Sequence, residues 1–435
     1  MLELFRFKAA PLPGSIFLAT ITCGVVDTGD PQTVPGGGSP HPEEDDTAGA
    51  GAANGGGGSE DAADDDDADA DDDDDDDDDD GGGGGGAEQD WPSWDGSGDH
   101  VAPSVDPPGG IAVADAPMFV AFGFDDNAYA DSIEWFADLV RMKKNADGSP
   151  VRGTFFLTAG YADEKLVTDG GQTAQDVLDA WRMLFDDGHE IANHTFSHAH
   201  GRTEDTAWWS DEITRARTLF VDDLGVPQSR LWGFRTPFLE YNTSTFEALR
   251  GLGMRYDCSI EFGYNWWQHD PEDWTTGHGP GEADSGEWYA WPYTLDNGSA
   301  EGSSDGGAGA NPGMWEIPVY TYNQLRGESV STITGFDFNM WLTLPSDVEF
   351  LDVMKFSFDQ RYRGNRSPFT VNAHTDYYSQ YNEWDDPEFG CKDYLKRREA
   401  LEKFLDYVLS FDEVRVVPFI RVIDWMRDPV PWQEM

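Results

Sequence analysis

The stretch MFVAFGFDD, residues 118–126, joins a short apolar run to two adjacent carboxylates. An unbroken run of this length is typical of a strand buried on both faces of a parallel sheet. Residues 131–142 follow it with apolar side chains at helical spacing. The segment therefore predicts a strand and then an amphipathic helix, with Asp125 and Asp126 at the junction.

The same alternation of strand and helix continues along the chain. Further strands are predicted at residues 153–158, 190–193, 231–234, 255–259, 315–319, 369–373 and 415–418, and further helices at residues 173–185, 208–224 and 394–410, with a last helix starting at residue 422. This order indicates an α/β fold with a mainly parallel sheet, either open or closed into a barrel. We interpret residues 266–311, rich in Gly, Asp and aromatic residues, as an elaborate insertion at its rim.

Polar side chains follow several of these strands, and folds of this kind carry their active sites at the carboxyl ends of strands. Besides the two aspartates, they are His194, Arg235 and His374. Each has a structural explanation when taken alone. Paired aspartates cap helices, an arginine at a strand end forms surface ion pairs, and a lone histidine often only packs. Their shared placement favours a catalytic site.

The segment HTFSH places His194 and His198 four residues apart. On one helical turn this spacing puts both imidazoles on the same side, within reach of one ion. With Asp126 they form a ligand set that suits zinc and leaves positions open for water and substrate. Such an ion acidifies water and polarises a carbonyl, which is hydrolytic chemistry. A merely His-rich turn is the alternative, because His189 and His200 lie close by.

The motifs, taken in order, resemble those of the polysaccharide deacetylases of carbohydrate esterase family four, the NodB-homology group. The matching segments are Gly123-Phe124-Asp125-Asp126, His194-Thr195-Phe196-Ser197-His198, Arg235-Thr236-Pro237-Phe238, Tyr256-Asp257-Cys258-Ser259-Ile260 and the strand that ends in His374. Residues 189–192, 291–296, 315–318 and 424–426 look similar to chitin deacetylases of arthropods and their bacterial relatives. The resemblance covers roughly residues 115–430 and implies a NodB-type distorted (β/α) barrel.

This resemblance implies a metal site and a general base. Asp126, His194 and His198 would bind zinc or another divalent transition metal. Asp125 would take a proton from the attacking water, and Arg235 would hold that carboxylate ionised and oriented. The sequence departs from the family at Gly123, where a threonine is usual, and at Asn127, where glycine or alanine is frequent.

The resemblance also implies a general acid and an oxyanion donor. His374 would protonate the leaving amine, and Asp257 would orient this histidine and raise its basicity. The backbone N–H of Phe238 would stabilise the oxyanion of the tetrahedral intermediate. The residues expected to line a substrate groove are Pro237, Trp266, Trp267 and Trp291.

Composition divides the chain into a tether and a folded domain. The 435 residues carry a net charge of −56, and residues 24–110 contribute 28 acids with neither Lys nor Arg. A stretch of Gly, Asp, Pro and Ser buries too little apolar surface to offset the entropy of ordering it, so we predict a disordered tether over residues 24–114. Residues 115–435 are the predicted deacetylase domain. Residues 111–435 still hold 55 acids against 26 bases, which argues against nucleic-acid or anionic-membrane binding.

Residues 1–23 are interpreted as an export signal. Arg6 and Lys8 form a small basic region, and a short apolar stretch then ends at Cys23. That stretch is too short to cross a bilayer as a helix. Two interpretations stay open: a plain secretory signal, or a lipoprotein signal that anchors the protein at Cys23. Either one predicts a secreted or cell-surface protein, and we expect a monomer.

Three functions remain open at this point. The first is removal of acetyl groups from N-acetylglucosamine-containing glycans such as chitin, chitooligosaccharides or peptidoglycan. The second keeps the site and changes the substrate to the O-acetyl groups of xylan or another acetylated polysaccharide. The third is a catalytically silent carbohydrate-binding protein, although such a protein would have lost a base, a ligand or an acid. The two remaining cysteines, Cys258 and Cys391, either pair or stay as thiols.

Overall fold

The computed structural model describes residues 98–163, 172–262, 289–299, 307–326, 329–333, 335–344, 346–382 and 393–435. The predictions made for the export signal, Cys23, residues 24–97 of the tether, Trp266, Trp267 and Cys391 lie outside these residues. The strands are β1 (Met118–Asp125), β2 (Thr154–Leu157), β3 (Glu190–Asn193), β4 (Gly233–Phe234), β5 (Tyr256–Asp257), β6 (Glu261–Phe262), β7 (Tyr293–Thr294), β8 (Trp315–Glu316), β9 (Val319–Tyr320), β10 (Tyr322–Arg326), β11 (Ser329–Ile333), β12 (Phe369–His374) and β13 (Val414–Val416). The α-helices are α1 (Ala130–Arg141), α2 (Ala174–Asp186), α3 (Thr206–Asp222), α4 (Thr243–Gly251), α6 (Asp337–Thr343), α7 (Asp347–Arg363), α8 (Tyr394–Val408) and α9 (Phe419–Arg427).

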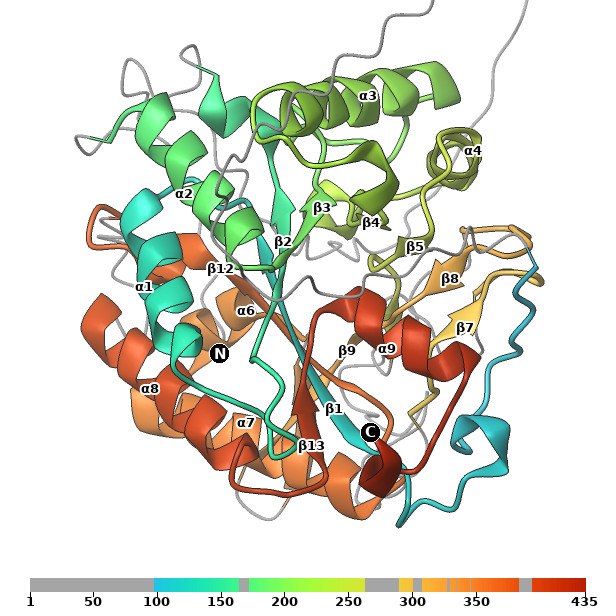
Figure 1. Cartoon of the computed structure of the whole chain (residues 1–435), viewed down its shortest axis with the longest axis vertical. Coiled ribbons are helices and arrows are strands. Elements are labelled where there is room, and N and C mark those ends of the chain that lie inside the picture. The colour runs from blue at the N-terminus through green and yellow to red at the C-terminus, as the bar shows by residue number, and fades with distance from the viewer. Residues whose placement is uncertain are drawn as a thin grey trace, which may run out of the picture. The chain divides into compact units, whose positions relative to one another are not determined.

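The main sheet has nine strands in the order β12-β1-β2-β3-β4-β5-β8-β7, with β13 also paired to β1. All of its pairings are parallel except the antiparallel pair of β7 and β8. The sheet curls into a half-barrel with helices packed around it (Figure 1). The predicted α/β barrel-like fold is therefore confirmed. Among the described helices, none is long and apolar enough to span a bilayer.

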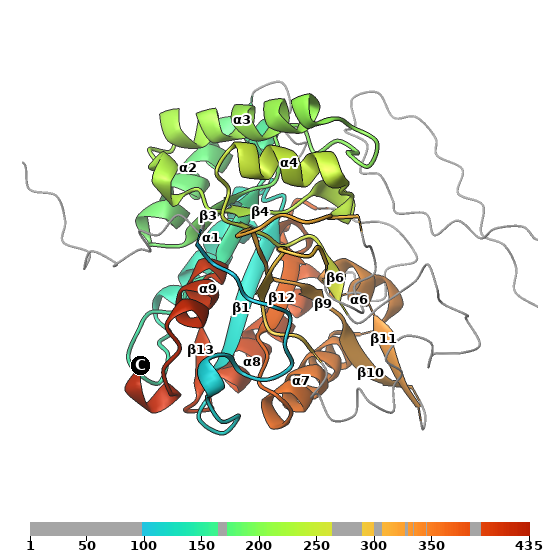
Figure 2. The same cartoon turned by 90° about the vertical axis from the view of Figure 1, so that its right-hand side faces the viewer.

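Strand β1 is buried on both faces, as its unbroken apolar run predicts. On the outer face, the ring of Phe124 lies edge-on to Phe136 of α1 with 4.5 Å between centroids. On the inner face, α9 packs into the curve of the sheet, close to β1 in both views (Figures 1 and 2). A Cβ atom at Gly123 would lie 2.6 Å from a ring carbon of Phe419. Glycine is needed at this position because the ring from α9 fills the space of a side chain.

The predicted long elements are present with ends that differ by at most three residues, but several elements were not predicted. The α-helices α4, α6 and α7 and the hairpin of β10 and β11 have no counterpart in the sequence prediction. Helix α7 has a weak apolar stripe because it carries polar residues on its buried side, including Ser357 and Gln360. Helical periodicity is therefore hard to read there.

The folded part begins upstream of residue 115, where the predicted tether was expected to end. Within residues 98–114, Asp99 accepts a hydrogen bond from Trp315 Nε1 at 2.9 Å. The backbone N–H of Val101 donates to Thr294 Oγ1 at 2.8 Å. Residues from Asp99 onward thus pack on the far edge of the sheet, so residues 99–114 belong to the folded part and not to the predicted tether.

The described part of the predicted rim insertion contains one short strand, with turns and irregular structure around it. Strand β7 adds to the main sheet beside β8. Trp291, predicted to line a substrate groove, is 1% exposed and packs 5.6 Å from the ring of Trp425. That prediction is wrong, because an aromatic residue beside an edge strand can bury its ring in the core as readily as present it to solvent. Cys258 is a buried free thiol.

Candidate metal and catalytic site

The turn after β1 presents the first carboxylates. Asp126 and Asn127 both have left-handed backbones, with φ of 65° and 64°. Asn127 tolerates this conformation better than most residues. Its buried Nδ2 donates to the carbonyls of Phe124 at 2.9 Å and Phe156 at 3.0 Å, and its Oδ1 accepts from Thr375 Oγ1 at 3.1 Å. These bonds hold the turn, so Asn127 is explained as the residue that orients Asp126.

The segment that carries the two histidines is a tight turn rather than the expected helical turn. Thr195 and His198 have φ of 69° and 52°, which no α-helix contains. The Thr195 N–H donates to Asn193 Oδ1 at 2.9 Å, and Thr195 Oγ1 accepts from the His198 N–H at 3.2 Å. The turn still brings the rings of His194 and His198 to 5.1 Å between centroids. The prediction of a helical turn is wrong, because the left-handed backbones of Thr195 and His198 bring the two imidazoles together without a helix.

The predicted metal ligands come together. One ligand atom each from Asp126, His194 and His198 lies within 4.8 Å of the others. Asp126 Oδ1 is 3.1 Å from His198 Nε2 and 3.8 Å from His194 Nε2. This is the facial arrangement of two imidazoles and a carboxylate that divalent transition metals favour.

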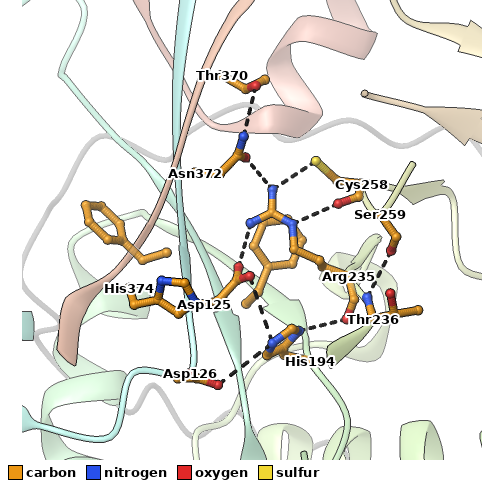
Figure 3. Close-up of polar contacts among 12 residues, drawn as sticks. Asp125, Asp126, His194, Arg235, Thr236, Cys258, Ser259, Thr370, Asn372 and His374 are labelled. Atoms are coloured by element: carbon orange, nitrogen blue, oxygen red, sulfur yellow. Dashed lines mark hydrogen bonds and ion pairs between the residues drawn. The ribbon is translucent and has the colours of Figure 1, made fainter. Parts of the chain in front are cut away.

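The protonation of His194 fits metal binding. Its Nδ1 lies 2.8 Å from the backbone oxygen of Arg235, so Nδ1 carries the proton and donates it there. The lone pair of Nε2 is then left facing Asp126 (Figure 3). Burial lowers the pKa of His194 to about 3, which keeps the imidazole neutral. A neutral ring whose other nitrogen is hydrogen-bonded is the form in which histidine binds metals.

Asp125 is held by a buried arginine. Arg235 Nη1 donates to Asp125 Oδ1 at 2.5 Å, and its Nη2 donates to Asn372 Oδ1 at 2.6 Å and to Cys258 Sγ at 2.9 Å (Figure 3). The guanidinium lies 4.1 Å from the centre of the Phe156 ring. Burial raises the pKa of Asp125, and the charge of Arg235 opposes that rise. The Asp125 carboxylate is therefore fully desolvated, and Arg235 fixes its orientation.

His374 is paired with an aspartate that the sequence did not indicate. Its Nδ1 is 2.9 Å from Asp337 Oδ1, and its backbone N–H donates to Asp337 Oδ2 at 3.1 Å. Burial by itself would lower the pKa of His374, but the hydrogen bond and charge of Asp337, together with the charges of Asp126 and Asp125, raise this pKa to about 9. Asp337 opens the unpredicted helix α6. An acid between Phe336 and Phe338 in an otherwise apolar segment is the signal that could have found it.

The prediction that Asp257 orients His374 is wrong. Asp257 accepts from the hydroxyl and the N–H of Ser259 at 2.8 and 2.9 Å, and it lies in register with Glu316 of β8. Side chains alternate between the faces of a strand. Cys258 contacts Arg235 on the inner face, so Asp257 points to the other face, away from the catalytic residues.

The Arg-Thr-Pro-Phe turn lies beside the metal ligands. Pro237 is buried, and Phe238 has a left-handed backbone with φ of 56°. The Phe238 ring lies edge-on to His198 with 4.6 Å between centroids and stacks on His200 at 4.1 Å. The ring therefore supports a metal ligand, a contribution that sequence reasoning missed when it assigned only the backbone of Phe238 a role.

Comparison with known proteins shows similarity to polysaccharide deacetylases. Residues 116–256 match the family model for polysaccharide deacetylases. The chain is 27% identical over 342 residues to chitin deacetylase 8 of Bombyx mori, with 75% of each chain covered. It is also 27% identical over 143 residues to a chitin deacetylase of Pestalotiopsis sp, which covers 33% of this chain and 42% of that protein.

A solved structure assigned as a polysaccharide deacetylase of Mycobacterium smegmatis aligns at 16% identity with a TM-score of 0.46, covering 75% of this chain and 95% of that one. Residues 116–256 are thus the part of this chain that is similar to the polysaccharide deacetylase family.

Proposed function

We propose that the domain is a metal-dependent hydrolase that removes acetyl groups from N-acetylglucosamine-containing glycans, such as chitin, chitooligosaccharides or peptidoglycan. The observation that carries this proposal is the pairing of Asp125 with His374. They are register partners on the neighbouring parallel strands β1 and β12. Asp125 is held by the cation Arg235, and His374 is held by the anion Asp337. These environments suit Asp125 to accept a proton and His374 to donate one.

In this proposal Asp125 accepts the proton of the attacking water. Arg235 keeps the carboxylate ionised and aimed, since its guanidinium is fixed by Asn372 and Cys258. Asp126, His194 and His198 are the residues that would hold a zinc or other divalent transition metal, which supplies a Lewis acid that activates water and polarises the acetyl carbonyl.

His374 supplies the proton that the leaving group needs. An amide nitrogen is a poor leaving group until it is protonated, and His374 is charged below its pKa of about 9. Its Nδ1 is occupied by Asp337, which leaves Nε2 as the atom that donates the proton. The backbone N–H of Phe238 is placed, in the same proposal, to donate to the developing oxyanion.

The test is acetate release. The purified chain, loaded with zinc, is incubated with chitooligosaccharides, peptidoglycan fragments and acetylated xylan. We expect acetate from the N-acetylated glycans, loss of turnover on chelation and recovery on adding zinc. Asp125→Asn should lower kcat by about 10²- to 10⁴-fold while zinc binding is retained. Asp138→Asn is the matched control, because this side chain is 70% exposed on α1.

No acetate from any N-acetylated glycan, with bound metal confirmed, would contradict the proposal. Faster release from acetylated xylan than from chitooligosaccharides would favour an O-acetyl esterase instead. We also propose that the domain, tethered by the acidic segment, acts outside the cell or at its surface. The support for this location is the predicted signal in residues 1–23.

A further inference from the structure

Glu212 of α3 contacts the turn that carries both histidines. It is 4% exposed, and its Oε2 accepts three hydrogen bonds. The donors are the Phe196 N–H at 3.1 Å, the Ser197 N–H at 2.7 Å and the Ser197 hydroxyl at 2.9 Å. Phe196 and Ser197 lie between the two histidines in sequence, so one carboxylate oxygen holds the middle of the segment that connects His194 to His198.

The turn needs such support because its backbone is strained. Thr195 and His198 both have positive φ, and a β-branched residue such as Thr195 rarely adopts this conformation. Strained conformations persist only where the surroundings over-determine them. The carbonyls of Thr195 and Phe196 accept from the N–H groups of Ala159 and Gly160 at 3.1 and 2.8 Å. These two bonds hold the carbonyls of Thr195 and Phe196, and Glu212 holds the N–H groups of Phe196 and Ser197.

The free-energy cost of burying the Glu212 carboxylate is offset by a cation at its second oxygen, Oε1. Arg215 Nη1 lies 3.3 Å from Glu212 Oε1. The same guanidinium lies 3.8 Å from the centre of the Phe196 ring, so Arg215 covers the turn from outside. A buried carboxylate is tolerated when donors and a cation satisfy it, as they do here. Glu212 is thus built into the turn rather than exposed on the helix surface.

We propose that Glu212 is a positioning residue that sets the separation of His194 and His198 and thereby the affinity of the site for a divalent metal. Its hydrogen bonds go to Phe196 and Ser197, so it acts through the segment between the two histidines. This inference rests on the metal site of the proposed function. It goes beyond that function because it assigns a helix outside the site a share in metal binding.

The test measures metal binding directly. Apoprotein is titrated with Co²⁺, and the visible spectrum of the bound ion reports both affinity and ligand geometry. Glu212→Gln keeps the shape of the side chain but replaces a charged acceptor with a neutral one. We expect about tenfold weaker Co²⁺ binding and an altered spectrum, at the lower end of the 10- to 100-fold effect of residues that support metal ligands.

The matched control is Asp211→Asn. Asp211 is the preceding residue of the same helix, it lies 3.7 Å from the same arginine, Arg215, and its side chain is 68% exposed. The control removes the same charge without touching the turn, so its Co²⁺ affinity should equal that of the wild type. A folded Glu212→Gln protein that binds Co²⁺ as tightly as Asp211→Asn would overturn the inference.

If Glu212→Gln does not fold, a milder variant tests the role of Glu212 in metal binding. Ser197→Ala removes one of the three donors and should weaken Co²⁺ binding by about two- to threefold, in proportion to the smaller loss. Unchanged affinity in this variant would also overturn the role of Glu212. A wild-type protein without any Co²⁺ spectrum would instead refute the metal site itself, and this inference with it.

Discussion

The pKa of His374 depends strongly on its hydrogen-bond partner, Asp337. Burial lowers the pKa of His374, but Asp337, with smaller contributions from Asp126 and Asp125, raises it to about 9. A general acid works in its protonated form, so activity should persist below this pKa and fall as the pH rises through it. Asp337→Asn removes the stabilising charge, and the pKa should fall toward the value of 6.5 of an unperturbed histidine. We therefore expect the alkaline limb of the kcat/KM profile to move to lower pH.

The control for this prediction is Asp257→Asn, at the residue that the sequence assigned to the same role. Asp257 contacts Ser259 on the other face of β5, so its replacement should leave the alkaline limb in place. A shift of that limb in Asp257→Asn, or none in Asp337→Asn, would contradict the pairing seen in the structure.

At the scale of elements, the turn between β1 and α1 depends on Asn127. Asn127→Ala removes two bonds to backbone carbonyls and one from Thr375, and it places alanine in a left-handed backbone. Lost buried hydrogen bonds and the strained backbone together should lower the free energy of unfolding by about 2–4 kcal/mol. Urea denaturation measures this loss, and weaker Co²⁺ binding should accompany it because Asp126 is the adjacent residue.

Asn127→Gly separates the two causes. Glycine adopts positive φ without strain, so it should lose the hydrogen bonds but recover about 1 kcal/mol relative to alanine. Equal stability of the two variants would show that the side-chain bonds alone support the turn.

At the scale of the whole molecule, negative charge is spread well beyond the tether. Residues 111–435 carry 55 acids against 26 bases, so the folded domain repels itself at low ionic strength. Added salt screens this repulsion, since the Debye length falls from about 10 Å at 0.1 M to about 3 Å at 1 M. We expect the Tm to rise by several degrees between these concentrations of KCl in calorimetry.

A comparison of salts identifies the cause. Chloride and sulfate at equal ionic strength should act alike if screening dominates, whereas sulfate should stabilise more if exclusion from the surface dominates. A Tm that stays constant or falls with KCl would show that repulsion does not limit the stability of the domain.

The sequence by itself determined the alternation of strand and helix, the resemblance to polysaccharide deacetylases, and which polar residues stand at strand ends. These properties are local: apolar period, strand length and motif spacing are all present in short windows. Asp125, Asp126, His194, His198 and His374 were predicted on that basis. The structure brings the three predicted ligands together and sets His374 beside Asp125.

Only the tertiary structure decided which residues support that set. Asp337 reaches His374 across 37 residues of chain, and its helix has no clear sequence signal. Asp257 faces away from the site because a shift of one position along a strand reverses the face of the sheet. Trp291 is in the core, and Glu212 binds a turn that the sequence suggested was helical. A local pattern shows that a carboxylate or ring is present, but its direction and partner depend on packing between segments distant in the chain.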